Sequence, residues 1–169
     1  MNSDSSRVTP PLSSDAIDFE LKFENATLVA ALDYWRSRCR GEAMPKRDDI
    51  DPLEMRGFIG KVALIEVEND AAGARNYRVR LAAKSLEDVY GPVTGKTLSG
   101  FLEPDMEERW RLLFDAVVAA GVPVRHAGQV AFQGKSWLHT EVLLAPLADD
   151  SGRIAMLFLT VSFSMPSVA

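Results

Sequence analysis

Two histidines, His126 and His139, and one cysteine, Cys39, are the side chains of this chain best suited to bind a metal. Imidazole and thiolate groups are the usual ligands of zinc and of redox metals, and they must converge on one point. Cys39 is far from both histidines in the sequence, and we expect it to be a small buried hydrophobe. The sequence therefore predicts neither a metal centre nor a cysteine-based active site.

The spacing of the histidines also argues against a shared metal. Gly134-Lys135 is a Gly-X pair of the kind that forms two-residue hairpin turns. A turn there places His126 opposite Leu143, and both histidines then lie on one face of the hairpin. They are four residues apart along it, which corresponds to roughly 13 Å at the rise of a strand. We expect His139 to serve packing or a hydrogen bond.

Two other patterns resemble catalytic motifs. The segment 91–97, GPVTGKT, has three residues between its glycines, whereas a phosphate-binding loop needs four and a buried strand before it. The acidic clusters at 48–51 and 107–108 fall in a polar segment and on an exposed helical turn, and paired carboxylates need a dry cleft for acid–base work. We therefore expect no enzymatic activity. The charges of 47–51 are expected to pin the linker to the sheet by ion pairs.

Composition narrows the classes of protein further. The chain has 169 residues, 47% of them apolar, and a net charge of −5. An acidic chain is a poor general binder of nucleic acid, and no apolar run reaches the roughly 18 residues of a membrane span. The N-terminus lacks the pattern of a signal peptide. With one cysteine and hence no internal disulfide, we expect a cytoplasmic protein.

Hydrophobic periodicity predicts the elements that position these residues. Residues 1–17 are expected to be a mobile tail and 164–169 a second one. A helix is predicted over about 26–40, with Asn25 as N-cap and an apolar stripe at Leu28, Leu32, Trp35 and Cys39. A linker to residue 52 follows. Further elements are predicted in this order: strands 62–68 and 77–83, a short helix 85–90, a long helix 105–120, and strands 124–132, 137–145 and 154–163.

This order of elements resembles that of a PAS domain, a small sensory fold, over about residues 53–163. Residues 32–67, LDYWRSRCRGEAMPKRDDIDPLEMRGFIGKVALIEV, resemble more narrowly the opening of PAS_5, a subgroup of PAS proteins from alphaproteobacteria. The resemblance implies an α+β fold with a five-stranded antiparallel sheet and helices over one face. The N-terminal helix, within 18–52, would flank the other face or pack against a second copy.

The resemblance also implies a cavity between the sheet and its helices. The hairpin face with the smaller side chains is expected to point into it, with Gln129 opposite Thr140 as polar groups that orient a ligand. A filled core, with Gln129 bonded to backbone, is the alternative. The residues expected to line the pocket are Val79, Leu81, Leu86, Tyr90, Phe114, Val117, Gln129, Leu138, Thr140 and Val142. The residues expected to form an interface are Leu28, Leu32, Trp35, Phe132 and Trp137.

The cofactors of PAS domains can be compared with this sequence. Members that bond a flavin use a cysteine after the second strand, and residues 84–101 contain none. Members that bind haem use a histidine on the helices, whereas both histidines here fall on predicted strands. Covalent flavin and haem are thus disfavoured, and the cofactor is not identified.

The expected function is regulatory. The module would bind a small non-covalent ligand and signal through a partner protein, as a homodimer, by a shift in the sheet and the N-terminal helix. The alternative is a scaffold that binds no ligand and provides a dimer or partner interface.

Overall fold

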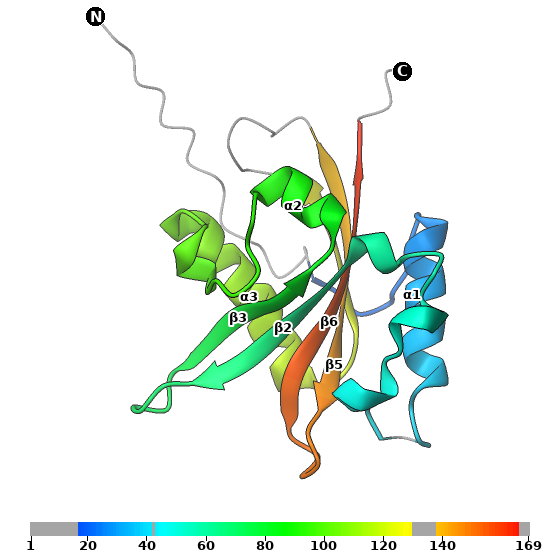
Figure 1. Ribbon diagram of the computed structural model, residues 1–169, viewed down its shortest axis with the longest axis horizontal. Helices are drawn as coiled ribbons and strands as arrows, with labels where there is room; N and C mark the ends of the chain where they lie inside the picture. Colours follow the sequence, from blue (N-terminus) through cyan, green and yellow to red (C-terminus); the bar gives the residue numbers. More distant parts are fainter. Residues whose placement is uncertain (1–16, 42, 130–137, 166–169) are drawn as a thin grey trace, which may run out of the picture.

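A computed structural model describes residues 17–41, 43–129 and 138–165. Its centre is an antiparallel sheet of six strands in the order β1-β4-β5-β6-β2-β3, with helices on both faces (Figure 1). The strands are β1 (Ile17–Asp18), β2 (Val62–Asn69), β3 (Arg75–Ala82), β4 (Val124–Gln129), β5 (His139–Ala148) and β6 (Ile154–Ser164). The five expected strands are therefore present, and β1 adds a two-residue strand beside β4.

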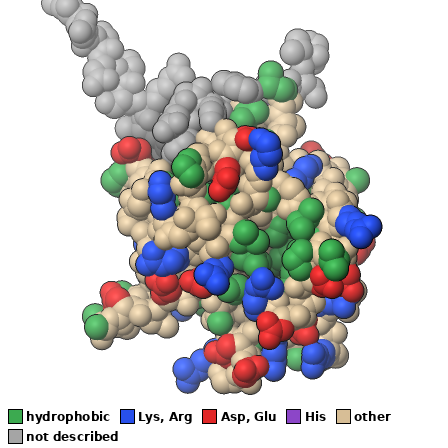
Figure 2. Space-filling model, in the orientation of Figure 1, with side chains coloured by type: hydrophobic (Ala, Val, Ile, Leu, Met, Phe, Trp, Pro, Cys, Tyr) green, Lys and Arg blue, Asp and Glu red, His purple; other side chains and the backbone are tan. Residues whose placement is uncertain are grey.

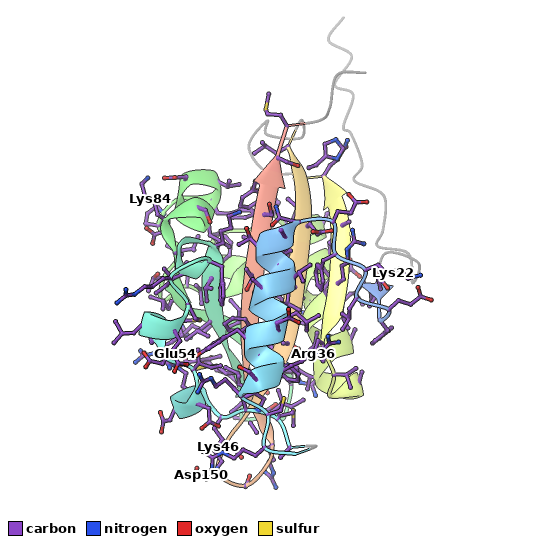
Figure 3. All side chains as sticks on the ribbon, turned by 90° about the vertical axis from the view of Figure 1, so that its right-hand side faces the viewer. Lys22, Arg36, Lys46, Glu54, Lys84 and Asp150 are labelled. Carbon is purple, nitrogen blue, oxygen red and sulfur yellow. The ribbon has the colours of Figure 1, made fainter. Side chains whose placement is uncertain are left out.

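The helices divide between the two faces of the sheet. We call the face covered by α2 (Lys84–Tyr90) and α3 (Pro104–Ala120) the inner face, and the face covered by α1 (Ala26–Ser37) the outer face. Figure 3 shows α1 lying lengthwise across the outer face. Four short 3₁₀ helices complete the chain: η2 (Arg47–Asp49), η3 (Pro52–Glu54), η4 (Ile59–Lys61) and η5 (Leu98–Gly100).

The sequence explains where the long helices begin and end. The side-chain oxygen of Asn25 accepts a hydrogen bond of 2.9 Å from the backbone N–H of Thr27, as expected of an N-cap. Gly121 ends α3 with a φ of 67°, in the left-handed region that glycine adopts without steric cost. The short helix α2 begins one residue before the predicted start, with Ala83 as N-cap, and the buried hydroxyl of Ser85 has no hydrogen-bond partner among the described residues.

Each face of the sheet has its own hydrophobic core. The inner core joins β-strand residues such as Tyr77 and Val142 to Leu113, Phe114 and Val117 of α3. The outer core joins Leu32 and Trp35 of α1 to Leu143, Ala145 and Phe158. Strand β5 therefore serves both cores with alternate residues, and both faces of its middle are fully buried.

The register of the β4–β5 hairpin differs from the predicted one by one residue. His126 lies opposite Val142, not Leu143, and Gln129 lies opposite His139. The buried His126 therefore faces the inner core, whereas the exposed His139 lies on the outer face, so the histidines do not share a face. The prediction was wrong because it fixed the register from the turn at 134–135, which is outside the described residues, as are Phe132 and Trp137. A shift of one residue changes the face of every side chain.

The loop 91–97 follows the free edge of β3. The backbone N–H of Val79 donates to Lys96 O at 2.9 Å, and the N–H of Gly95 donates to Val79 O at 2.7 Å. The only helix that follows closely is the three-residue η5. The glycines of this loop thus serve a turn along the sheet edge.

Candidate functional site

An apolar cavity of about 40 Å³ lies between the inner face of the sheet and the helices. The strands contribute alternate residues of β2, β3 and β6, and the small side chains Ala63 and Ala82 leave the space that larger residues would fill. The opposite wall comes from α2, η5 and α3. The lining residues are Ala63, Ile65, Val79, Ala82, Leu86, Tyr90, Val93, Leu98, Phe101, Leu102, Trp110, Phe114 and Leu159.

The size of this cavity limits what it can hold. A cavity must have a volume of at least about 10–15 Å³ to hold one water molecule, whereas a cavity that binds benzene has a volume of about 150 Å³. The cavity therefore exceeds one water but cannot accept a ring without movement of its walls. Its lining is apolar, so a small apolar group is the chemistry that it favours.

A second, more polar cavity of about 20 Å³ adjoins the first, and Tyr90 and Trp110 line both. Trp110 forms a side-chain hydrogen bond with the Tyr90 hydroxyl. Burial raises the pKa of Tyr90 well above its usual value, against the opposing influence of Arg109 and of this hydrogen bond. Tyr90 is therefore a neutral hydroxyl at physiological pH, between an apolar and a polar compartment. The remaining lining residues are Met106, Arg109, Leu113, His126, Gln129 and Thr140.

Arg109 is the most unusual group of the polar compartment. Its Nε is buried and has no hydrogen-bond partner among the described residues. A buried donor without an acceptor costs roughly 1–3 kcal/mol, and more where the group is charged. His126 lies beside it in the lining, and its ring packs closely on Gly128, where an added Cβ would lie 3.2 Å from His126 Nε2. The compartment thus offers an unsatisfied cationic donor to an acceptor.

The structure brings four of the predicted pocket residues together around the apolar cavity: Val79, Leu86, Tyr90 and Phe114. Val117 and Val142 lie in the inner core and are fully buried, but neither lines a cavity. Thr140 lines the polar compartment, where its hydroxyl donates a hydrogen bond of 3.4 Å to Gly128 O.

Two predicted pocket residues, Leu81 and Leu138, lie elsewhere, and a third, Gln129, has a different strand partner from the predicted one. Leu81 is on the outer face, 47% exposed, because a β-bulge between Leu64 and Ile65 interrupts the alternation of β3. Gln129 is exposed at the end of β4, opposite His139 and not Thr140 as a result of the register shift, but it lines the polar compartment together with Thr140. Leu138 is half-buried and lines neither cavity.

The predicted interface residues of α1 are occupied within the chain itself. Leu28, Leu32 and Trp35 are 0%, 4% and 7% exposed. The indole N–H of Trp35 donates a hydrogen bond of 3.0 Å to Pro146 O on β5. The helix therefore packs on its own sheet, which is one of the two arrangements expected. Phe132 and Trp137, the other two predicted interface residues, are outside the described residues.

A buried ion pair fixes the start of α1 to the sheet. Glu141 of β5 accepts hydrogen bonds from the backbone N–H groups of Glu24 (2.9 Å) and Asn25 (2.8 Å), and from Nε and Nη2 of Arg125 (2.9 and 2.6 Å). Burial raises the pKa of Glu141, but these hydrogen bonds outweigh it, and the pKa is lowered overall. Glu141 is therefore ionised at neutral pH and holds the first turn of α1. No pattern of neighbouring residues distinguishes Glu141 in the sequence.

The linker after α1 is also attached to the sheet. Lys46 forms an ion pair of 3.1 Å with Asp150 in the β5–β6 loop, and Figure 3 shows both side chains below α1. The backbone N–H of Ala148 donates to Pro45 O at 2.9 Å. Within the predicted charge cluster, Asp49 forms an ion pair of 2.8 Å with Arg40. This pair joins η2 to the start of the linker.

Comparison with protein-family models matches residues 23–160 to PAS_5, which is described as a PAS domain. The chain belongs to this family. The search of curated proteins found no match. In this PAS domain, the described residues include no group of three or more histidine, cysteine or carboxylate side chains that could hold a metal ion. None of its described helices has the length and apolar character needed to cross a bilayer.

Several residues of the site were absent from the predicted set. Trp110 of α3 lines both cavities but is not among the predicted pocket residues. Arg109 precedes it, and nothing in the sequence distinguishes this arginine from those on the surface. His126 was assigned to the opposite face. The correct register would have placed it on the inner face.

Proposed function

We propose that this PAS domain is a sensory module that binds a small amphiphilic molecule, with an apolar body and an anionic or acceptor head. The proposal rests above all on the buried Nε of Arg109, which has no acceptor in the described structure and lies beside an apolar cavity. A carboxylate head would satisfy this donor, and hydrogen bonds to charged groups contribute about 1.5–3 kcal/mol. The apolar body would occupy the space between Ala63, Ala82 and Phe114.

The small volume gives the binding a conformational consequence. Cavities of about 40 and 20 Å³ must enlarge to accept such a molecule. A ligand that binds an enlarged state better than the closed one shifts the population toward it. The module would thus report the ligand by a change of shape, without bond chemistry, and we place it in the cytoplasm.

The route to α1 runs through β5. Val142 and Leu144 pack on the inner side of this strand, and Leu143 and Ala145 pack on its outer side under α1. The same strand holds α1 at two points, through Glu141 and through Pro146 O. A displacement of β5 would therefore move the helix with it, and a partner protein would sense the helix or the linker.

A second candidate is a scaffold that binds no ligand, and the closed core favours it. Phe114 is 2% exposed, and its ring packs against Trp110 at 5.7 Å and Tyr77 at 5.0 Å between centroids. The inner core is almost completely filled by its own side chains, and such a core is stable without a bound ligand. The scaffold would then act only through its surface.

Binding of octanoate and octan-1-ol, measured by two-dimensional NMR titration, separates the two candidates. We expect octanoate to bind at least about tenfold more tightly than the alcohol, as the charged head meets Arg109. The variant Arg109→Met should lose this preference for octanoate. The variant Ala63→Leu, which fills the apolar cavity, should weaken the binding of both compounds. Arg36→Met, on the exposed side of α1, is the matched control and should change neither affinity.

Native mass spectrometry of the freshly purified chain provides an independent check. A mass excess that disappears on denaturation would establish a bound molecule and begin its identification. If no mass excess is found, and neither octanoate nor octan-1-ol shows saturable shifts in the wild type, the ligand proposal is refuted and the scaffold stands.

A further inference from the structure

The polar compartment beside the apolar cavity has polar groups on two of its walls. Helix α3 contributes Arg109 to one wall, and the strands β4 and β5 contribute His126, Gln129 and Thr140 to the other. The compartment has a volume of about 20 Å³, which corresponds to one or two water molecules. Polar groups around so small a space contact atoms that lie close together in one ligand. The head of a ligand would therefore meet both walls.

Thr140 is the polar group of the sheet wall from which a ligand would displace water. Its side chain is 9% exposed, and among the described residues its hydroxyl has a hydrogen bond of 3.4 Å, to Gly128 O on β4. Hydrogen bonds from a hydroxyl to an oxygen are usually about 2.5–3.0 Å long, so this contact is weak. His126 has an interaction partner already, and Gln129 is exposed and remains hydrated. The hydrogen bonding of Thr140 therefore depends most on what fills the compartment.

The direction of this hydrogen bond determines which ligand group Thr140 can meet. A carbonyl oxygen only accepts, so the Thr140 hydroxyl donates its hydrogen to Gly128 O. The hydroxyl oxygen keeps two lone pairs, which can accept a hydrogen bond. The ligand must therefore donate at this point. A keto oxygen cannot donate, and an ammonium group would place a positive charge beside that of Arg109. A ligand hydroxyl meets both conditions.

Arg109 determines the other half of the head group. On the face of the molecule shown in Figure 2, lysines and arginines lie among acidic side chains. Arg109 instead lines the polar compartment, and its buried Nε has no hydrogen-bond partner among the described residues. A carboxylate would supply the missing acceptor. Tyr90 and Trp110 line both compartments, so a chain attached to this head would continue past them into the apolar cavity.

We infer that the ligand of this site is a hydroxy acid, whose carboxylate contacts Arg109 and whose hydroxyl donates a hydrogen bond to Thr140. Because both residues line the same small compartment, the hydroxyl belongs on the second or third carbon of the chain. The inference rests on the proposed function, since it adds a group to the head of the proposed amphiphile. It makes Thr140 the residue that distinguishes a hydroxy acid from an unsubstituted acid of the same length.

Two-dimensional NMR titrations of the full chain test the inference with octanoate, 2-hydroxyoctanoate, 3-hydroxyoctanoate and 2-oxooctanoate. Octanoate displaces water from the Thr140 oxygen and offers no donor in return. One of the hydroxy acids should therefore bind at least about fivefold more tightly than octanoate, as expected for one additional hydrogen bond. The keto acid, 2-oxooctanoate, has the same chain length and charge but no hydroxyl, and it should bind no more tightly than octanoate.

Two variants of Thr140 connect this preference to its hydroxyl. Thr140→Val removes the hydroxyl from a side chain of nearly the same shape, so the ratio of the hydroxy-acid affinity to the octanoate affinity should fall to about one. Thr140→Ser keeps the hydroxyl and should retain the preference for the hydroxy acid. Thr160→Val is the matched control, because Thr160 is fully buried but pairs with Leu143 of the outer core, and its ratio should equal that of the wild type. Circular dichroism shows whether each variant is folded.

The outcomes separate this inference from the proposed function. If octanoate binds and depends on Arg109, but no hydroxy acid is preferred, the inference is overturned and the proposed function stands. A preference that survives in Thr140→Val, or an equal preference for 2-oxooctanoate, would also overturn it, because Thr140 would then not recognise a donated hydrogen bond. If none of these acids binds the wild type, the proposed function fails and the inference fails with it.

Discussion

The substitution Glu141→Gln tests how firmly α1 is attached to the sheet. Glu141 is 8% exposed and receives four hydrogen bonds, two of them from Arg125. Glutamine keeps the shape but removes the charge, and it turns an NH₂ group toward N–H donors. Breaking one side of a buried ion pair costs about 3–5 kcal/mol. We expect a loss of about 3 kcal/mol, which lowers the melting temperature of a chain of this size by about 6–12 °C.

The dependence on pH follows from the direction of the pKa shift. The folded-state pKa of Glu141 is lowered, so its contribution to stability is fully present above the unfolded pKa of about 4.3. The contribution is lost as the pH falls through the folded pKa, when the wild type takes up the proton that glutamine cannot bind. The stability difference between the wild type and Glu141→Gln should therefore be largest near pH 7 and should narrow below about pH 4.

Urea denaturation of both proteins between pH 3 and pH 7 measures this difference. Glu20→Gln is the control, since Glu20 is an exposed partner of Lys22, and its midpoint should follow that of the wild type at every pH. A loss below about 1 kcal/mol at pH 7, or a difference that stays constant down to pH 3, would show that Glu141 does not anchor the helix as an ion.

Two further substitutions test the packing of α1 and the end of α3. Leu28→Ala removes a fully buried side chain of α1 and should lower the free energy of unfolding, measured by urea denaturation, by about 2–5 kcal/mol. The control Leu112→Ala changes a side chain that is 45% exposed and should lower it by less than about 1 kcal/mol. Equal losses of stability in the two variants would contradict the packing of α1 on the sheet. Gly121→Ala forces a Cβ into a left-handed conformation and should lower stability by about 1 kcal/mol, or about 2–4 °C in melting temperature. Gly57→Ala is the control, because a Cβ at residue 57 meets nothing within 4 Å. A Gly121→Ala variant as stable as the wild type would refute the role of Gly121 in ending α3.

The elements were predictable because local chemistry determines them. Asn25 caps the first helix through its own side chain, and Gly121 ends the long one through its φ of 67°. The strands were recognisable by alternation, and β2, β3 and β6 begin within two residues of the expected positions. Such signals depend on residues close in the sequence, so no tertiary information was needed.

The details of the site were less predictable, because they depend on contacts between distant segments. The register of β4 and β5 is set by what packs on each face, and a prediction from the turn placed His126 on the wrong face and paired Gln129 with Thr140 instead of His139. The bulge that turns Leu81 outward has no signal in the sequence of β3. Glu141 looks like any strand carboxylate until the start of α1 is placed over it.

The loop 91–97 affects how the folded chain behaves at high concentration. A sheet edge with free N–H and C=O groups invites strands of other molecules to pair with it, and this is a common start of aggregation. Here Gly95 and Lys96 bond to the backbone of Val79, which occupies the edge groups of that residue. Pairing of another strand with Val79 is therefore blocked. Shortening the loop would therefore free these groups of Val79 to pair with a strand of another molecule.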